Sequence, residues 1–143
     1  MKTIKQLLQT KGYDVWSIGP HASVFDAIKL LSDKGVGALP VVDGEKLVGI
    51  ISERDYARKV ILQGKSSKET PVSEIMTRKV YFIRTEHSVE EAMALMTDKH
   101  IRHLPVFEDD RMIGIVSIGD LVRDIISQQE FLIGQLENYI TGS

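Results

Sequence analysis

The sequence contains no cysteine among its 143 residues, and this absence excludes several kinds of protein. Disulfides, zinc–thiolate centres and thiol nucleophiles all require cysteine. No stretch approaches the roughly 18 consecutive apolar residues that a membrane-spanning helix needs. The N-terminus, Met1 to Lys5, also lacks the apolar core of a signal peptide. We therefore predict a cytoplasmic protein that does not interact with membranes.

Long basic runs are absent too, and the formal net charge is −2. Proteins that bind duplex nucleic acid need a basic face, so this class is disfavoured. Hydrophobic residues make up 43% of the chain and charged residues 27%, which is typical of a soluble globular protein. The length suits a single compact module.

Candidate catalytic groups are equally scarce. No nucleophile stands beside a base in any recognisable pattern, and the four histidines are scattered. Only His100 and His103 are close in sequence, and they lack Asp or Cys partners at the spacing of a metal site. We therefore expect neither an enzyme nor a bound metal.

An internal repeat organises what is present. The stretch Gly49–Asp55, Gly-Ile-Ile-Ser-Glu-Arg-Asp, returns 65 positions later as Gly114–Asp120, Gly-Ile-Val-Ser-Ile-Gly-Asp. At this constant offset, residues 15–61 align with 80–126 without a gap, and 17 of the 47 positions are identical. A unit of this size rarely buries a core alone, so the copies are expected to pack together about a pseudo-two-fold axis.

The repeat predicts one module over residues 1–143. It comprises a first repeat at 13–64, a connector at 65–79, a second repeat at 80–127 and a C-terminal helix at 128–143. Each repeat reads as strand, helix, strand, strand, helix, which is an α+β fold. In the first copy these elements are residues 15–18, 23–34, 39–42, 47–52 and 53–62. A short helix at 3–11 precedes them, and one helical turn at 70–76 lies in the connector.

The corner between strand and helix has two possible roles. Ser-x-x-Asp ahead of an apolar run, as at Ser52 and Asp55, forms a capping box that begins a helix. The same position offers unpaired backbone N–H groups that suit a ribose and a phosphate. Gly49 has no Cβ, so another group can approach the backbone there. Ser23 and Ser88 begin similar patterns without a preceding glycine and strand, and we interpret them as plain caps.

Two copies of this unit, each with Leu-Pro-Val and Gly-Ile-[Ile/Val]-Ser-x-x-Asp, resemble a pair of CBS domains. Such a pair, named for cystathionine β-synthase, is also called a Bateman module, and the resemblance covers residues 13–127. It implies a regulatory module that binds an adenosine-containing ligand in clefts between the repeats. AMP, ADP, ATP, NAD and S-adenosylmethionine are the ligands implied. The alternative is a ligand-free module that regulates a partner enzyme through its helices.

The resemblance also assigns residues. A carboxylate has two acceptor oxygens and can accept hydrogen bonds from both vicinal hydroxyls of a ribose. The ribose-binding residues are therefore Asp55, Asp120, Ser52 and Ser117. Phosphate would be bound by Arg102, His103 and Arg54, all in the cleft of Asp55, which leaves mainly backbone N–H groups and small residues around Asp120. The adenine pocket would be formed by Ile18, Val36, Gly37, Ala38, Ile50, Ile83, Ile101 and Ile115.

A homodimer is the last implication. The helices that follow the two corners would form its interface through apolar residues, namely Tyr56, Val60, Leu121, Val122 and Ile125. Beyond Ser127, further apolar residues recur at helical spacing and either fold back on the body or pack on another chain. These are Phe131, Leu132, Leu136, Tyr139 and Ile140.

Overall fold

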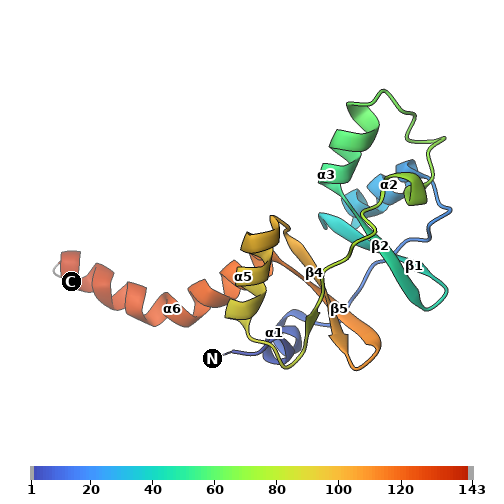
Figure 1. Ribbon diagram of the computed structural model, residues 1–143. Helices are drawn as coiled ribbons and strands as arrows, with labels where there is room; N and C mark the ends of the chain where they lie inside the picture. Colours follow the sequence, from blue (N-terminus) through green and yellow to red (C-terminus); the bar gives the residue numbers. More distant parts are fainter. Residues whose placement is uncertain (1, 142–143) are drawn as a thin grey trace. The chain divides into compact units, whose positions relative to one another are not determined.

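A computed structural model of the chain describes residues 2–141, apart from the side chains of residues 131–133 and 141. The chain divides into two compact units. We call Val15–Tyr81 the first-repeat unit, and Met1–Asp14 together with Phe82–Ser143 the second-repeat unit. Both units combine helices with a small sheet, so the α+β fold predicted from the repeat is confirmed (Figure 1).

The first-repeat unit is built on an antiparallel hairpin. Strands β1 (Ala38–Asp43) and β2 (Lys46–Ser52) pair, with a bulge between Val41 and Val42. The helices of the unit are α2 (Val24–Lys34), α3 (Glu53–Tyr56), the π-helix η1 (Ala57–Ile61) and α4 (Val72–Ile75). Residues from both strands, α2, η1 and α4 form one buried apolar core, including Val24, Leu39, Ile51, Val60 and Ile75. Tyr56 of α3 is partly buried and packs against it.

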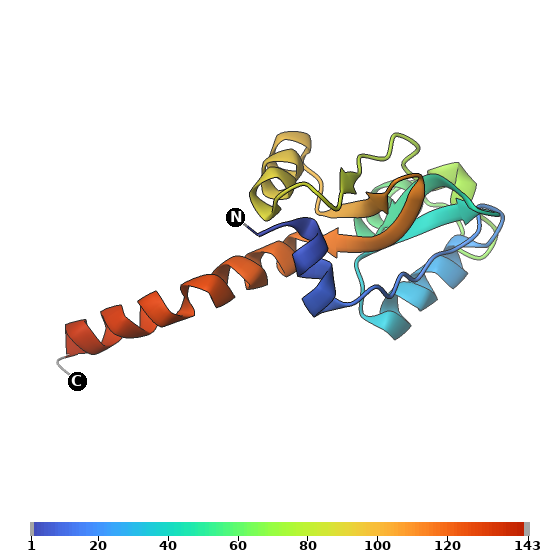
Figure 2. The ribbon, with the colours of Figure 1, turned by 90° about the horizontal axis from the view of Figure 1, so that it is seen from below.

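The second-repeat unit repeats this plan with a third strand. Strands β4 (His103–Glu108) and β5 (Arg111–Ser117) form the hairpin, and β3 (Ile83–Arg84) pairs parallel to β4. Its helices are α1 (Ile4–Lys11), α5 (Val89–Lys99) and α6 (Ile118–Thr141). In Figures 1 and 2, the C-terminal part of α6 extends away from the sheet of its own unit. No helix in the described part of the chain is long and apolar enough to cross a membrane.

Helix α1 completes the core of the second-repeat unit, although the sequence places it before the first repeat. The Ile4 N–H donates to the His87 carbonyl at 2.8 Å, and Leu8 is fully buried. In the first-repeat unit, α4 has the same role, because the Val72 N–H donates to the Ala22 carbonyl at 2.8 Å. Each repeat is therefore closed by a helical segment that the repeat alignment leaves out.

Most of the elements predicted from the sequence are confirmed. Helix α1 begins at a Thr3 capping box, α2 begins at Ser23, and Gly35 ends α2 in the left-handed conformation. The connector also forms its predicted turn, with Ile75 and Met76 buried.

Two predicted elements differ in detail. The strand expected at residues 15–18 is reduced to one parallel bridge between Ile18 and Val41, and the turn at Gly19–Pro20 ends it immediately. The helix expected at residues 53–62 widens into a π-helix after Tyr56, where the Leu62 N–H bonds the carbonyl of Ala57, five residues back. Such wide turns are rare and frequently occur at functional sites.

Candidate functional site

The Asp55 corner, residues 49–55, joins β2 to α3. The Ser52 hydroxyl accepts a hydrogen bond from the Asp55 N–H at 3.2 Å, and Asp55 Oδ2 accepts one from the Ser52 N–H at 3.0 Å. Asp55 Oδ1 lies 3.0 Å from the Lys59 ammonium and accepts from the Thr77 hydroxyl at 3.2 Å. The Asp55 side chain is only 10% exposed, so these polar partners balance the cost of burying its carboxylate.

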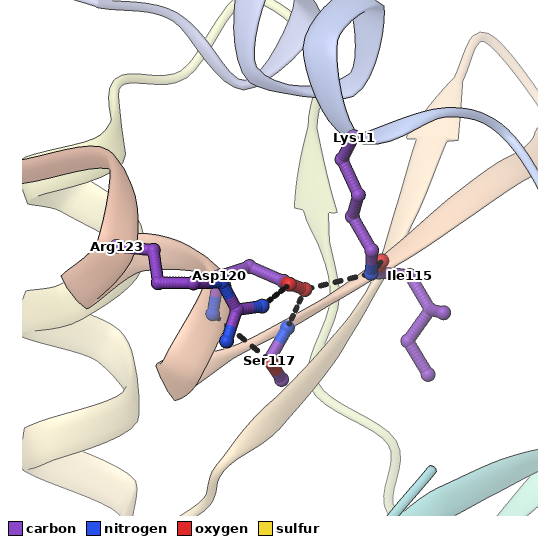
Figure 3. A network of polar contacts seen from close by, with 5 residues as sticks. All are labelled: Lys11, Ile115, Ser117, Asp120 and Arg123. Atoms are coloured by element: carbon purple, nitrogen blue, oxygen red, sulfur yellow. Dashed lines mark hydrogen bonds and ion pairs between the residues drawn. The ribbon is translucent and has the colours of Figure 1, made fainter. Parts of the chain in front are cut away.

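The Asp120 corner, residues 114–120, has the same capping box but different cations (Figure 3). Asp120 Oδ2 accepts from the Ser117 N–H at 2.8 Å and lies 2.7 Å from the Lys11 ammonium. Asp120 Oδ1 lies 2.6 Å from Arg123 Nη2. Lys11 also donates to the Ile115 carbonyl, so its ammonium is held at the end of β5.

The capping interpretation is therefore confirmed at both corners. The cap occupies only one oxygen of each carboxylate, because the serine N–H donates to Oδ2. The other oxygen, Oδ1, takes no part in the cap. The Oδ1 atoms are neutralised by flexible side chains, and the Arg123 side chain is 73% exposed. In each pair the cation reaches solvent while the carboxylate is nearly buried, so a ligand hydroxyl that replaces the cation must itself donate a hydrogen bond to Oδ1. Ser23 and Ser88 begin their helices as plain caps, as the sequence predicted.

One expectation is wrong. The surroundings of Asp120 were expected to consist mainly of backbone N–H groups and small residues, yet Lys11 and Arg123 both bind its carboxylate. The Arg123 pair follows the i,i+3 spacing of helical neighbours and was visible in the sequence. So was the i,i+4 pair of Lys59 with Asp55. Lys11 gave no such signal, because tertiary folding alone brings the end of α1 to a residue over 100 positions away.

Two of the predicted phosphate-binding residues lie in the same unit as Asp120. The Arg102 carbonyl accepts the Ile118 N–H at 2.8 Å, and His103 stands opposite Ser117 in the β4–β5 register. The third, Arg54, is exposed on α3 of the first-repeat unit. The grouping of all three in one cleft stays a prediction.

Two ionisable groups here have shifted pKa values. Burial lowers the pKa of His103, and the positive charges of Lys11 and Arg102 lower it further against the opposing effect of Asp120. Burial alone would raise the pKa of Asp120, but hydrogen bonds from Lys11 and Ser117 bring it below its usual value. At neutral pH the corner thus combines a carboxylate with two neighbouring cations and an uncharged imidazole.

The predicted apolar residues are divided between the units. Beside Asp55, the Ile50 backbone exchanges hydrogen bonds with Thr77, Ala38 is buried opposite Ser52, and Ile18 bridges to β1. A pocket of about 620 Å³ lies between the C-terminal half of α2 and the start of α3. Val36 and Gly37 line it together with Glu53 and Tyr56.

The second unit holds the remaining three residues of the predicted adenine pocket. Ile83 is buried in β3, whereas Ile101, just before β4, and Ile115, within β5, are half-buried. Among the described residues, no three His, Asp or Glu side chains gather as a metal site would require.

The glycine at the head of each corner does admit a close neighbour, but that neighbour is the protein itself. A Cβ at Gly49 would lie 2.6 Å from Met76 Sδ and 3.0 Å from the Thr77 carbonyl oxygen. A Cβ at Gly114 would lie 3.1 Å from the methyl groups of Leu8. The two glycines therefore let α4 and α1 pack directly on the sheet.

Gly49→Ala is accordingly expected to lower the free energy of unfolding by about 1–3 kcal/mol, the usual cost of overpacking a core. Gly114→Ala is expected to cost less, because the Leu8 methyl groups can turn aside whereas the Thr77 carbonyl cannot. Urea denaturation measures both. In a Met76→Ala background, the Gly49→Ala penalty should shrink. An unchanged penalty there would contradict the packing explanation.

The residues predicted for a dimer interface need correction. Val60 and Leu121 are fully buried inside their own units and cannot contact a second chain. Of the other predicted residues, Val122 is exposed, whereas Tyr56 and Ile125 are half-buried. Ile61, Leu62 and Ile126 are also exposed nearby. Further along α6, Leu136, Tyr139 and Ile140 are exposed, whereas Phe131 and Leu132 lie outside the side chains that the structure describes.

The folds and corners described above define a pair of CBS domains. A family model for the CBS domain matches residues 4–61 and 72–127. The chain therefore belongs to the CBS-domain family and contains two CBS domains. Both matched ranges include the helical segment, α1 or α4, that precedes each repeat.

Named relatives agree with this assignment. A mitochondrial CBS domain-containing protein of Arabidopsis thaliana, CBSX3, is 43% identical over 98% of this chain and 72% of its own length. A putative signal-transduction protein with CBS domains from Burkholderia ambifaria is 49% identical, with a TM-score of 0.87 over 90% of this chain and 96% of that one. The CBS domain pair of protein MJ0100, in complex with 5′-methylthioadenosine and S-adenosyl-L-methionine, is 30% identical. Its TM-score is 0.75, over 90% of this chain and 98% of that one.

Proposed function

We propose that this CBS-domain pair is a regulatory sensor that binds an adenosine-containing ligand at its two Ser–Asp corners. AMP, ADP, ATP, NAD and S-adenosylmethionine are the candidate ligands. The related domain pair of MJ0100 was crystallised with two adenosine derivatives, which supports this chemical class.

The observation that carries the proposal is the recurrence of one carboxylate geometry in both units. In each unit, Asp Oδ2 accepts the serine N–H of the capping box, and Oδ1 pairs with a cationic side chain, Lys59 or Arg123. A plain cap, such as that of Ser88 and Glu91, needs no cation on its carboxylate. Since vicinal ribose hydroxyls donate to carboxylate oxygens, Oδ1 is the atom that a ligand would use.

Roles for the neighbouring residues follow from the proposal. Ser52 and Ser117 would add hydrogen bonds to the ribose or phosphate, and the apolar residues on the adjoining strands would contact the base. Arg102, His103 and Arg54 would bind phosphate. No catalytic step is proposed for any of these residues. The module would act by changing the activity of a partner protein when the ligand binds.

A thermal-shift screen tests this function. A ligand that binds only the folded chain adds about 2.7 kcal/mol of stability when its concentration is 100 times Kd. At least one of the five candidate ligands should therefore raise the melting temperature by several degrees, whereas GMP, with the same ribose phosphate and another base, should not. If no adenosine compound produces a shift at millimolar concentration, the sensor proposal fails.

The alternative is a ligand-free module that regulates a partner enzyme. Exposed apolar side chains on η1 and α6 favour some protein contact, since large apolar patches are rarely left in water. The same residues could form the interface of a homodimer, so an experiment must distinguish binding of a partner enzyme from binding of a second copy of the chain. A cytoplasmic location also stays a prediction, and one relative is named as mitochondrial.

The homodimer is tested by light scattering at micromolar concentration. We expect twice the 16.0 kDa of one chain. Ile126→Glu places a charge on a side chain that is half exposed, so it should convert the dimer to a monomer without unfolding it. A monomeric mass for the unaltered chain would refute the dimer and leave the exposed residues to a different partner.

A further inference from the structure

The C-terminal part of α6 lies beyond the CBS-domain match, which ends at residue 127. It extends away from the sheet of its own unit (Figures 1 and 2). Tyr139 is 88% exposed, Ile140 is 78% exposed and Leu136 is 53% exposed, although all three side chains are large and apolar. Such side chains are rarely left together in water, so this part of the helix presents a contact surface.

The apolar residues of α6 recur every seven positions, which is the spacing of a coiled coil. In heptad terms, row a is Val122, Gln129 and Leu136, row d is Ile125, Leu132 and Tyr139, and row e is Ile126, Ile133 and Ile140. An α-helix has 3.6 residues per turn, so a seven-residue repeat stays on one face over several heptads only where the helix winds around another helix. The pattern therefore favours a second helix as the partner of this surface.

The charges of α6 restrict the kind of partner. They comprise one cation, Arg123, and four acids, namely Asp120, Asp124, Glu130 and Glu137. Helices that bind lipid surfaces are rich in Lys and Arg on their polar face, so an acidic helix is poorly suited to a membrane. A second copy of α6 is not repelled, because the positions beside rows a and d carry isoleucine at e and the neutral Gln128 and Gln135 at g.

Gln129 is the one residue of these three rows that is neither aliphatic nor aromatic. In a parallel, in-register pair of helices, Gln129 lies opposite Gln129 of the second copy, and each amide offers donors and an acceptor to the other. An antiparallel pair matches row a with row d, so it sets Gln129 against an apolar residue and leaves its amide unpaired. A single polar residue in row a selects register and strand number in coiled coils, and Gln129 therefore favours the parallel arrangement.

We propose that residues 122–141 of α6 pair with the same segment of a second copy of this chain as a parallel, in-register coiled coil of two helices. The inference goes beyond the proposed sensor function, because no ligand takes part in it. It rests on the predicted homodimer, to which it assigns a surface that lies mostly outside the CBS-domain match.

Light scattering of the full chain tests this surface. Leu136→Glu sets two carboxylates against each other in row a, so it should raise the dissociation constant of the dimer by at least about tenfold and give the mass of one chain at micromolar concentration. Asn138→Glu is the matched control, since it adds the same charge two residues away, at position c outside the three rows. It should leave the mass of the dimer unchanged. Circular dichroism should show that both variants stay folded, because Leu136 lies outside the core.

Cysteine cross-linking tests the orientation, and the chain has no cysteine of its own to interfere. Under mild oxidation, Leu136→Cys should give a disulfide-linked dimer on a non-reducing gel, because row-a residues of a parallel pair face each other. Asn138→Cys should stay largely uncross-linked. An antiparallel pair along the full segment would separate the two Leu136 positions by several helical turns.

The outcomes distinguish the inference from the proposals made above. If the unaltered chain is a dimer but Leu136→Glu does not weaken it, or Leu136→Cys does not cross-link, the inference is wrong and the homodimer has another interface. If the unaltered chain is a monomer at micromolar concentration, the inference and the homodimer are both overturned, whereas the sensor function stands.

Discussion

Leu8→Ala is expected to lower the free energy of unfolding of the second-repeat unit by about 2–5 kcal/mol. Leu8 is fully buried, and its methyl groups cover Gly114 in the middle of β5. Removing them opens a cavity that the sheet cannot close, because the neighbouring position has no side chain to move inward. Urea denaturation followed by circular dichroism measures the loss.

Leu62→Ala is the matched control. Leu62 carries the same side chain but is 76% exposed, so its truncation should change stability by less than about 0.5 kcal/mol. Equal effects of the two substitutions would mean that α1 does not form part of the core.

The second large effect concerns ligand affinity. Asp55→Asn and Asp120→Asn keep the size of the side chain but remove the charge that strengthens bonds to ribose hydroxyls. Each lost charge-assisted bond corresponds to roughly 1.5–3 kcal/mol, or about 10- to 100-fold in affinity. Calorimetric titration of AMP into each variant should show one site weakened and the other retained.

Asp110→Asn serves as control, since this exposed acid lies in the β4–β5 turn, at the opposite end of that hairpin from Ser117. It should leave AMP affinity unchanged. If AMP binds both corner variants as tightly as the unaltered chain, the two carboxylates have only their capping role. The helices they begin would then explain the motif completely.

The sequence by itself determined the fold and the two corners. A gapless repeat at an offset of 65, with Ser-x-x-Asp after a short β-branched run, predicted two α+β units and their helix starts. These signals are local: a cap joins residues three apart, and a strand shows its faces by alternation. Because the residues that make these interactions are close together in the sequence, the sequence pattern alone predicts them.

Tertiary structure decided which residues surround each carboxylate and which apolar side chains are buried. Lys11 reaches Asp120, and Thr77 reaches Asp55, across many intervening residues. Leu121 faces the core whereas Val122 beside it is exposed, although both are apolar. Gly49 and Gly114 admit Met76 and Leu8 rather than a ligand. Such contacts depend on how α1 and α4 dock on the sheets, and no spacing along the chain encodes a partner so distant in sequence.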